Sequence, residues 1–414
     1  MKLVIKTSQA VEDALASPPS TNKPGSEPKR SLAGDLTRFI PSEIGLILMM
    51  FVVTRAVLLL IGMAARTTLQ PLLGVRPTGH LWLNIWAGND SRWYLDLVRH
   101  GYSPTNIDGL HGPSYAFFPA YPLLVRGLDF AVGDPYIAGL VLSNVCLLVA
   151  AFVLYKLVFI DADAQIALGA VKYLFLFPTA FLFSGFASES LFLALLVGSF
   201  FFARRGIWLG CGIAGFAMAL ASPIGVIVFI PLLVDYLMQA RWNPARIGLD
   251  ILPLLLIPVG AMVFGGYMYY VSGDPLALVH TYMRWYGQLT NPLDVLINGL
   301  VTGSALQAPG VFARVGTYFA LAAVVLLLLL LVALRQGGLA YWALGMCLIV
   351  VPLATGAAAL PLMPRVVLTI FPLYIMLGAV AITSQTVDLI TTVSLALLQG
   401  FLMVLWTGGT GLVG

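Results

Sequence analysis

The amino-acid sequence predicts an all-α protein that crosses a membrane many times. Of its 414 residues, 60% are hydrophobic and only 10% are charged, and the apolar residues stand in long unbroken runs. A soluble domain carries roughly 25% charged residues, so a water-soluble globule is excluded, as is a disordered chain. An outer-membrane barrel is excluded as well, because its strands alternate apolar and polar residues.

The first 40 residues differ from the rest of the chain. They are polar and contain Ser17-Pro18-Pro19-Ser20, a composition that cannot bury a core. We therefore expect residues 1–40 to form a flexible cytoplasmic tail and residues 41–414 to form one membrane domain. The first apolar run starts near Ile44 without a clear cleavage site, which favours a signal anchor over a cleavable signal peptide.

About eleven apolar stretches follow the tail, taking roughly 20 residues for each membrane crossing. They lie near 44–65, 135–159, 166–186, 189–203, 206–221, 223–238, 249–271, 311–334, 339–358, 365–383 and 386–408.

Basic residues in the short loops predict the orientation, because Lys and Arg are enriched on the cytoplasmic side. If the tail is cytoplasmic, the loops that fall on the same side carry Lys156, Arg204, Arg205, Arg241, Arg246 and Arg335. Two long segments, 66–134 and 272–310, then face the outside. Long loops in a compact protein are usually functional.

The first external segment contains DSRWYLDLVRHGY, from Asp90 to Tyr102. On a helix, Asp90, Trp93 and Tyr94 share an aromatic face that suits the membrane interface. Asp90 fits either a helix N-cap or a general base, and the two roles are not exclusive. In FFPAYPLLVR, from Phe117 to Arg126, the two prolines predict that no regular helix runs through the segment. Its aromatic residues favour an interfacial supporting element.

Five stretches in this order resemble the PIG-V-like mannosyltransferases, which belong to the GT-C superfamily of membrane glycosyltransferases. Their order and spacing extend the resemblance over most of residues 45–380. The stretches are Asp90–Tyr102, Phe117–Arg126, Phe177–Phe192, Ser272–Trp285 and Pro364–Gly378.

This resemblance implies a GT-C-type bundle of about eleven transmembrane helices, with amphipathic helices in the large first external loop. It implies an inverting enzyme that moves a hexose, with mannose expected, from a polyprenyl-phosphate donor to a glycolipid, glycan or protein acceptor. By the resemblance, Asp90 matches the catalytic aspartate. Family members often carry Thr-Arg-Pro-x-Gly where this chain has Ala221-Ser222-Pro223-Ile224-Gly225, so one arginine is missing.

A lipid phosphate leaves without needing a proton, so this chemistry requires one general base and cations for the phosphate. We predict Asp90 as the base. Arginine suits the phosphate because its charge is permanent and its donors are forked. The first candidate is Arg365, at the outer end of a span, although an arginine that merely reaches the interface is an alternative. The other candidates are Arg284, Arg126 and Arg92.

Sugar and acceptor candidates are Glu189, Trp93, Tyr94, His280 and Trp285. Glu189 starts an outer helix, where capping and the helix dipole alone also favour a carboxylate. The tryptophans and the tyrosine are equally typical of an interfacial aromatic belt, and a lone histidine is more often structural.

No metal or other cofactor is expected, since no His, Cys and Asp residues have zinc-ligand spacing. The cysteines, Cys146, Cys211 and Cys347, each stand alone in an apolar run. Asp161-Ala162-Asp163 has the DxD pattern of metal-dependent transferases, but it falls on the predicted cytoplasmic side. A net charge of +4, without a basic and aromatic block, indicates no nucleic-acid partner.

A lipid or solute transporter without catalysis is the main alternative. Arg55 in the first span favours a transporter, because intramembrane charges mark transport paths. The absence of duplicated halves in the sequence argues against one, because many transporters are built from such repeats. A GT-C transferase of another sugar, such as glucose or arabinose, is the alternative within the enzyme class. We expect a prokaryotic plasma membrane with the site on the external face, or the endoplasmic reticulum in a eukaryote.

Overall fold

The computed structural model describes residues 41–414 apart from several gaps, and every secondary-structure element within the described part is helical. The gaps are 70–79, 89, 103–113, 287–288, 303–320, 322–323, 326, 329–337, 357–359, 361 and 409–414. The predicted tail and most of the span predicted at 311–334 therefore lie outside the described residues.

Four of the described helices are long and apolar enough to cross a membrane. They are α3 (Pro41–Leu69), α7 (Pro135–Asp161), η6 with α12 (Leu249–Leu255 and Leu256–Ser272), and α19 (Gln385–Thr407). Shorter helices pack between them: α8 (Ala164–Leu176), α9 (Glu189–Arg204), α10 (Trp208–Ala221), α11 (Phe229–Gln239), α16 (Leu339–Ala354) and α18 (Pro372–Ala381). Apart from 311–334, each predicted span coincides with one of these helices or with a helix and an adjoining short turn. The protein is an all-α, polytopic integral membrane protein.

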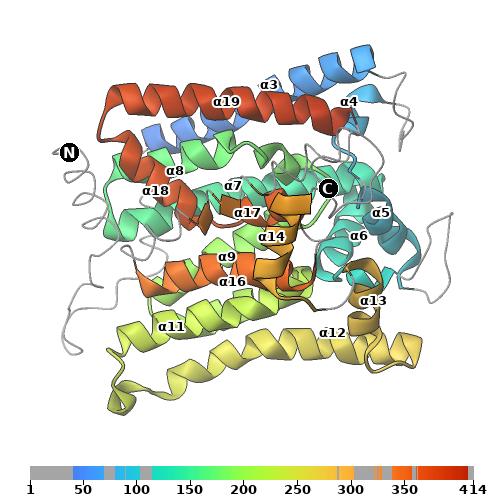
Figure 1. Ribbon diagram of the computed structural model, residues 1–414, viewed down its shortest axis with the longest axis vertical. Coiled ribbons are helices and arrows are strands. Elements are labelled where there is room, and N and C mark those ends of the chain that lie inside the picture. Colours follow the sequence, from blue (N-terminus) through green and yellow to red (C-terminus); the bar gives the residue numbers. More distant parts are fainter. Residues whose placement is uncertain are drawn as a thin grey trace.

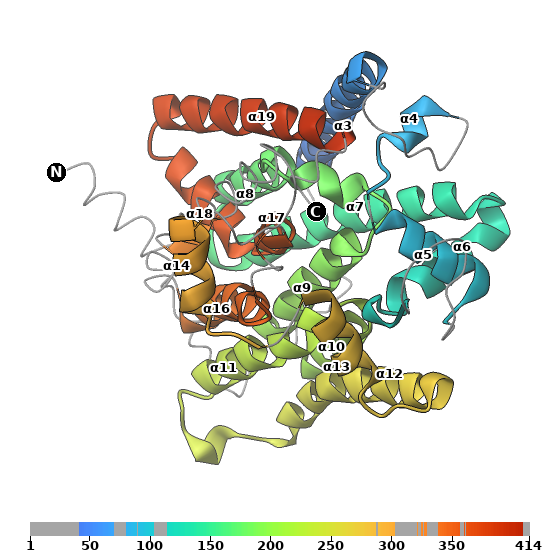
Figure 2. The same cartoon turned by 45° about the vertical axis from the view of Figure 1, so that its right-hand side comes forward.

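Three helices from the two predicted external segments, α5 (Ser91–His100), α6 (Ala120–Val132) and α13 (Ala277–Tyr286), lie at one end of the bundle (Figure 1, right), whereas α14 (Pro292–Thr302) of the second segment packs against α16. In both views α5 lies beside α6, and these two helices are in contact (Figure 2). From the second segment, α13 packs on η2 (Ser114–Ala116), which shortly precedes α6. The turn between α11 and η6, with Arg241 and Arg246, lies at the opposite end (Figure 1).

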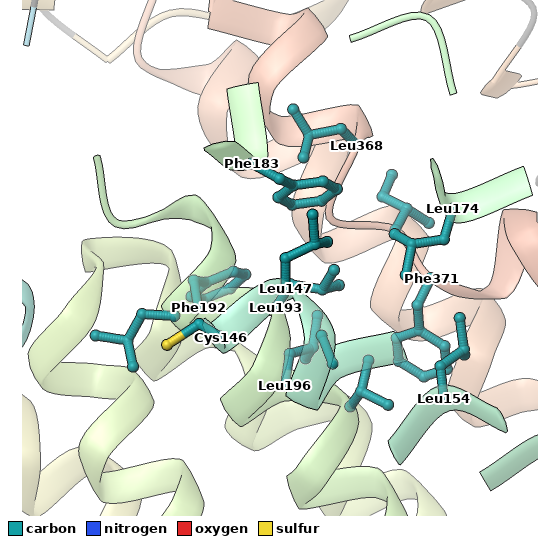
Figure 3. Packing of buried hydrophobic residues seen from close by; sticks show 14 of the residues in the cluster. Cys146, Leu147, Leu154, Leu174, Phe183, Phe192, Leu193, Leu196, Leu368 and Phe371 are labelled. Carbon is teal, nitrogen blue, oxygen red and sulfur yellow. The ribbon is translucent and has the colours of Figure 1, made fainter. Parts of the chain in front are cut away.

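The core at the centre of the bundle is apolar. Figure 3 shows Leu147 of α7, Leu193 and Leu196 of α9, and Phe371 directly before α18 packed together. Cys146 belongs to the same cluster, and all three cysteines are free thiols. Because lipid is as apolar as these side chains, such helices are held chiefly by close packing rather than by exclusion of water.

One close helix approach that depends on glycine joins α8 to α18. A Cβ atom on Gly378 would lie 2.7 Å from both the Ala170 nitrogen and the Ile166 oxygen, which are backbone atoms of α8. We expect Gly378→Ala to lower the melting temperature in detergent, because overpacking of this kind costs roughly 1–3 kcal/mol. In the control Gly198→Ala, on α9, the new methyl group meets nothing within 4 Å, so stability should hold. Equal melting temperatures for the two variants would contradict this packing.

Arg55, the feature that favoured a transporter, is a buried structural residue in α3. Its Nη1 donates to the Ala180 carbonyl at 2.9 Å and to Ser184 Oγ at 3.0 Å, and its Nη2 donates to the Phe175 carbonyl at 3.3 Å. The chain leaves helical geometry after α8 and turns through η3 (Ala180–Ser184). Arg55 thus donates to carbonyl groups on both sides of this break, at the end of α8 and at the start of η3.

The expectation that two prolines exclude a regular helix through Phe117–Arg126 is wrong, because α6 begins at Ala120 and continues to Val132. Pro119 is the N-cap and Pro122 lies in the first turn, where a backbone N–H has no intrahelical acceptor. No helical hydrogen bond is therefore lost, and the first one runs from the Leu123 nitrogen to the Pro119 oxygen at 3.0 Å.

The DxD pattern has structural contacts at both aspartates. Asp163 caps α8 by accepting from the backbone nitrogens of Gln165 at 3.1 Å and Ile166 at 3.0 Å. Asp161 pairs with Arg204 Nη1 at 3.5 Å. In the part of the chain that the structure describes, no group of three or more His, Cys, Asp or Glu residues is arranged to hold a metal ion.

Candidate active site

The start of α5 is fixed by Ser91, which leaves the Asp90 side chain available for other contacts. Ser91 Oγ accepts from the Gly88 nitrogen at 2.9 Å and donates to the Phe186 carbonyl at 3.1 Å. Asp90 occupies the N-cap position but has helical dihedral angles (φ −73°, ψ −19°), and its side chain makes no capping hydrogen bond. The simple capping role considered for Asp90 is therefore absent.

The start of α9 faces the same region. Ser188 is the N-cap residue of this helix, yet its hydroxyl lies 2.8 Å from the Tyr94 hydroxyl of α5 instead of capping the helix. Glu189 is the first residue of α9. The Tyr94–Ser188 contact holds the two helix starts together, which places Glu189 near Asp90.

Arg365 brings a third, distant part of the chain to the same point. It lies in α17 (Met363–Val367), which is tied to the bend after α8 by Thr179 Oγ1 donating to the Pro364 carbonyl at 3.1 Å. Arg365 Nη1 contacts Asp90 Oδ2. Its Nε and Nη2 lie 2.7 and 2.5 Å from Glu189 Oε1. One guanidinium thus serves two carboxylates, and this trio has a formal charge of −1.

The trio lines a cavity of about 380 Å³, which is in the size range of small-molecule sites. Tyr94 and Ser188 also line the polar side of the cavity. Arg365 is the one cationic residue among the described residues that line the cavity. The rest of the wall is mostly apolar and includes Phe117, Phe118, Phe192, Ile224, Ile227 and Val351.

Tyr94 is a buried hydroxyl in this wall. Burial, reinforced by the negative charge of Glu189, raises the pKa of its phenol well above the ordinary value. The phenol therefore stays protonated and supplies a neutral hydrogen-bonding group beside the two carboxylates.

The structure brings together four of the predicted site residues and separates the others. Asp90, Tyr94, Glu189 and Arg365 line the cavity. Trp93 stacks on Phe117 at 5.6 Å between ring centroids, so it supports the wall from behind. The exposed Arg92, Arg126, Arg284 and His280 are not among the lining residues. The Trp285 side chain lies outside the described residues.

The second external segment reaches the cavity through Tyr282, which is not one of the predicted site residues. Its hydroxyl donates to the Ala116 carbonyl at 2.9 Å. The predicted candidates on the same helix, His280 and Arg284, are four residues apart and share an exposed face, where His280 Nδ1 lies 2.7 Å from Asp274 Oδ2. Tyr282, midway between them, projects from the opposite side of the helix. The 3.6-residue period could have identified it.

Ser222, which stands where the resembling family often has arginine, also lines the cavity. It follows α10 directly and precedes η4 (Pro223–Val228). The departure from the family pattern therefore falls within the candidate site, and Arg365 has no second cation beside it among the described lining residues.

Comparisons with known proteins do not show the family of this chain. No family model matches it, and no curated protein matches it. Among solved structures, the chain is similar to an oligosaccharyltransferase of Archaeoglobus fulgidus that was crystallised with a tethered acceptor peptide. The two are 12% identical with a TM-score of 0.41, and the match covers 87% of this chain and 55% of the archaeal one. The chain thus spans about half the length of that enzyme.

Proposed function

We propose that this protein is a GT-C-type integral membrane glycosyltransferase. It moves a hexose, with mannose expected, from a polyprenyl-phosphate donor to a glycolipid, glycan or protein acceptor on the external face of the membrane. The observation that carries this proposal is the convergence of Asp90, Glu189 and Arg365, from three distant parts of the chain, on one largely apolar cavity. The five family-like stretches in the sequence support it.

Each group in the trio has a role in this reaction. Asp90 takes the proton from the acceptor hydroxyl, whose oxygen forms the new bond to the anomeric carbon of the sugar. The bond from that carbon to the phosphate oxygen breaks, and the lipid phosphate leaves with the electron pair. Arg365 stabilises the charge that develops on the phosphate. Glu189 and Tyr94 are placed to hydrogen-bond sugar hydroxyls.

The cavity wall suits a substrate with one polar and one greasy end. Ile224 and Ile227 of η4 and Val351 of α16 line the cavity together with the trio. We assign this apolar side to the prenyl chain. The acceptor then enters from the end of the bundle where α5 and α13 lie (Figure 1).

The test is transfer by the purified protein in lipid nanodiscs. Polyprenyl-phosphate mannose is supplied with a membrane extract as the acceptor source, and the released polyprenyl phosphate is measured by mass spectrometry. We expect release to continue in excess EDTA, because a phosphodiester needs no metal to bridge a diphosphate. Parallel reactions use the glucose and arabinose donors. Release from none of the three, or from the arabinose donor alone, would overturn the hexose transfer proposed here, because arabinose is a pentose. Activity that is lost in EDTA and restored by Mg²⁺ or Mn²⁺ would overturn its metal-free form.

A further inference from the structure

The contact between Asp90 and Arg365 conflicts with the geometry that inversion requires. In an inverting displacement the acceptor attacks the sugar from the face opposite the leaving group. In inverting glycosidases, the two carboxyl groups stand roughly 6.5–9.5 Å apart to leave room between them. A base and a phosphate-binding cation need comparable space, with the sugar ring between them. Here Asp90 Oδ2 touches Arg365 Nη1 directly, so no sugar fits between these groups.

The two carboxylates hold the arginine unequally. Glu189 Oε1 is within 2.7 Å of both Nε and Nη2, whereas the contact of Asp90 is with Nη1. The Glu189 side chain is 13% exposed and the Asp90 side chain is 28% exposed. The Asp90 contact is therefore the one that opens with less disturbance, while Glu189 keeps the guanidinium in place.

An incoming phosphate also has to compete for this arginine. A phosphate oxygen uses the same guanidinium N–H donors as a carboxylate. Among the described lining residues no other cation is present, so the phosphate has to share this one guanidinium with two carboxylates, which already engage three of its five N–H donors.

We propose that the Asp90–Arg365 ion pair belongs to the resting site and that the donor phosphate opens it. The phosphate replaces the Asp90 carboxylate on Nη1, the sugar occupies the space that opens, and Asp90 is released to face the acceptor hydroxyl. The base is thereby freed only when a donor is present, which makes donor binding precede acceptor binding. This inference rests on the proposed function.

The test compares binding of a sugar-free polyprenyl phosphate, with the neutral polyprenyl alcohol as reference ligand, by native mass spectrometry of the nanodisc-embedded protein. Asp90→Asn removes the charged competitor for Nη1, so we expect it to tighten phosphate binding about tenfold, the size of one charge-assisted contact. Glu189→Gln removes the same charge but leaves the Asp90–Nη1 contact, so it should tighten binding much less. Asp96→Asn, on α5 but outside the cavity lining, should change nothing.

Each result of this binding test supports or overturns the proposal. Equal tightening by Asp90→Asn and Glu189→Gln would show a general charge effect. It would overturn the exchange, that is, the replacement of Asp90 by the donor phosphate on Arg365. Unchanged or weaker phosphate binding by Asp90→Asn would overturn the exchange as well. Unaltered binding of the alcohol shows that a variant is folded. If Asp90→Asn does not fold, Asp90→Ser takes its place in the comparison of phosphate binding. If the wild type binds the alcohol but not the phosphate, the proposed donor class itself is wrong and the exchange falls with it. If the wild type binds the phosphate without the difference between variants, only the exchange fails.

Discussion

Replacing Asp90 by Asn is expected to reduce hexose transfer by about 10²–10⁴-fold, the usual contribution of a positioned general base. The amide has nearly the same shape as the carboxylate but accepts no proton from the acceptor hydroxyl. Because the Asp90 side chain makes no capping hydrogen bond, the start of α5 should keep its structure. The measurement is the rate of polyprenyl phosphate release at saturating donor.

Asp96→Asn is the matched control for this prediction. It makes the same chemical change on the same helix, at a residue that pairs with His100 at 2.8 Å and does not line the cavity. Transfer by this variant should equal that of the wild type. Turnover retained by Asp90→Asn, in protein with a normal melting temperature, would remove Asp90 as the base.

Much of the fold could be predicted because long apolar runs directly specify membrane helices. The helices α7 and α19 begin within one residue of the predicted starts of their spans, residues 135 and 386. The arrangement of the candidate site was harder to predict, because contacts between distant parts of the chain determine it. Asp90, Glu189 and Arg365 were each singled out, but Asp90 and Arg365 are separated by 275 positions, and no local pattern indicates that one guanidinium joins two carboxylates.

The remaining arginine candidates show why residue type alone selects a site poorly. Arg126 and Arg365 were both predicted to bind the phosphate from their places in the sequence, the first after an aromatic segment and the second after Pro364. In the structure Arg126 is exposed on α6, whereas the Arg365 side chain is 11% exposed and lies between two carboxylates. The difference arises from which helix face the fold covers. Likewise, Arg55 contacts one carbonyl in the last turn of α8 and another in η3, and both contacts depend on the end of α8 at Leu176, which hydropathy does not mark.

The second large effect is expected for Arg365→Gln, which should abolish transfer and also destabilise the protein. Removing the guanidinium leaves Asp90 and Glu189 facing each other without a cation. Breaking a largely buried ion pair by deleting one partner typically costs about 3–5 kcal/mol. The melting temperature in detergent should fall clearly, whereas Arg99→Gln, an exposed arginine of α5, should leave it unchanged.

A second substitution separates the structural effect from the chemical one. In Arg365→Gln with Glu189→Gln, the repulsion between the carboxylates is gone, so part of the lost thermal stability should return. Transfer should not return, because the lipid phosphate still lacks a cation as its negative charge develops. Recovery of both would mean that Arg365 serves only to neutralise the carboxylates. Recovery of neither would mean that the loss of stability arises from packing around α17, since the charge imbalance has been removed while the shape of the arginine has not been restored.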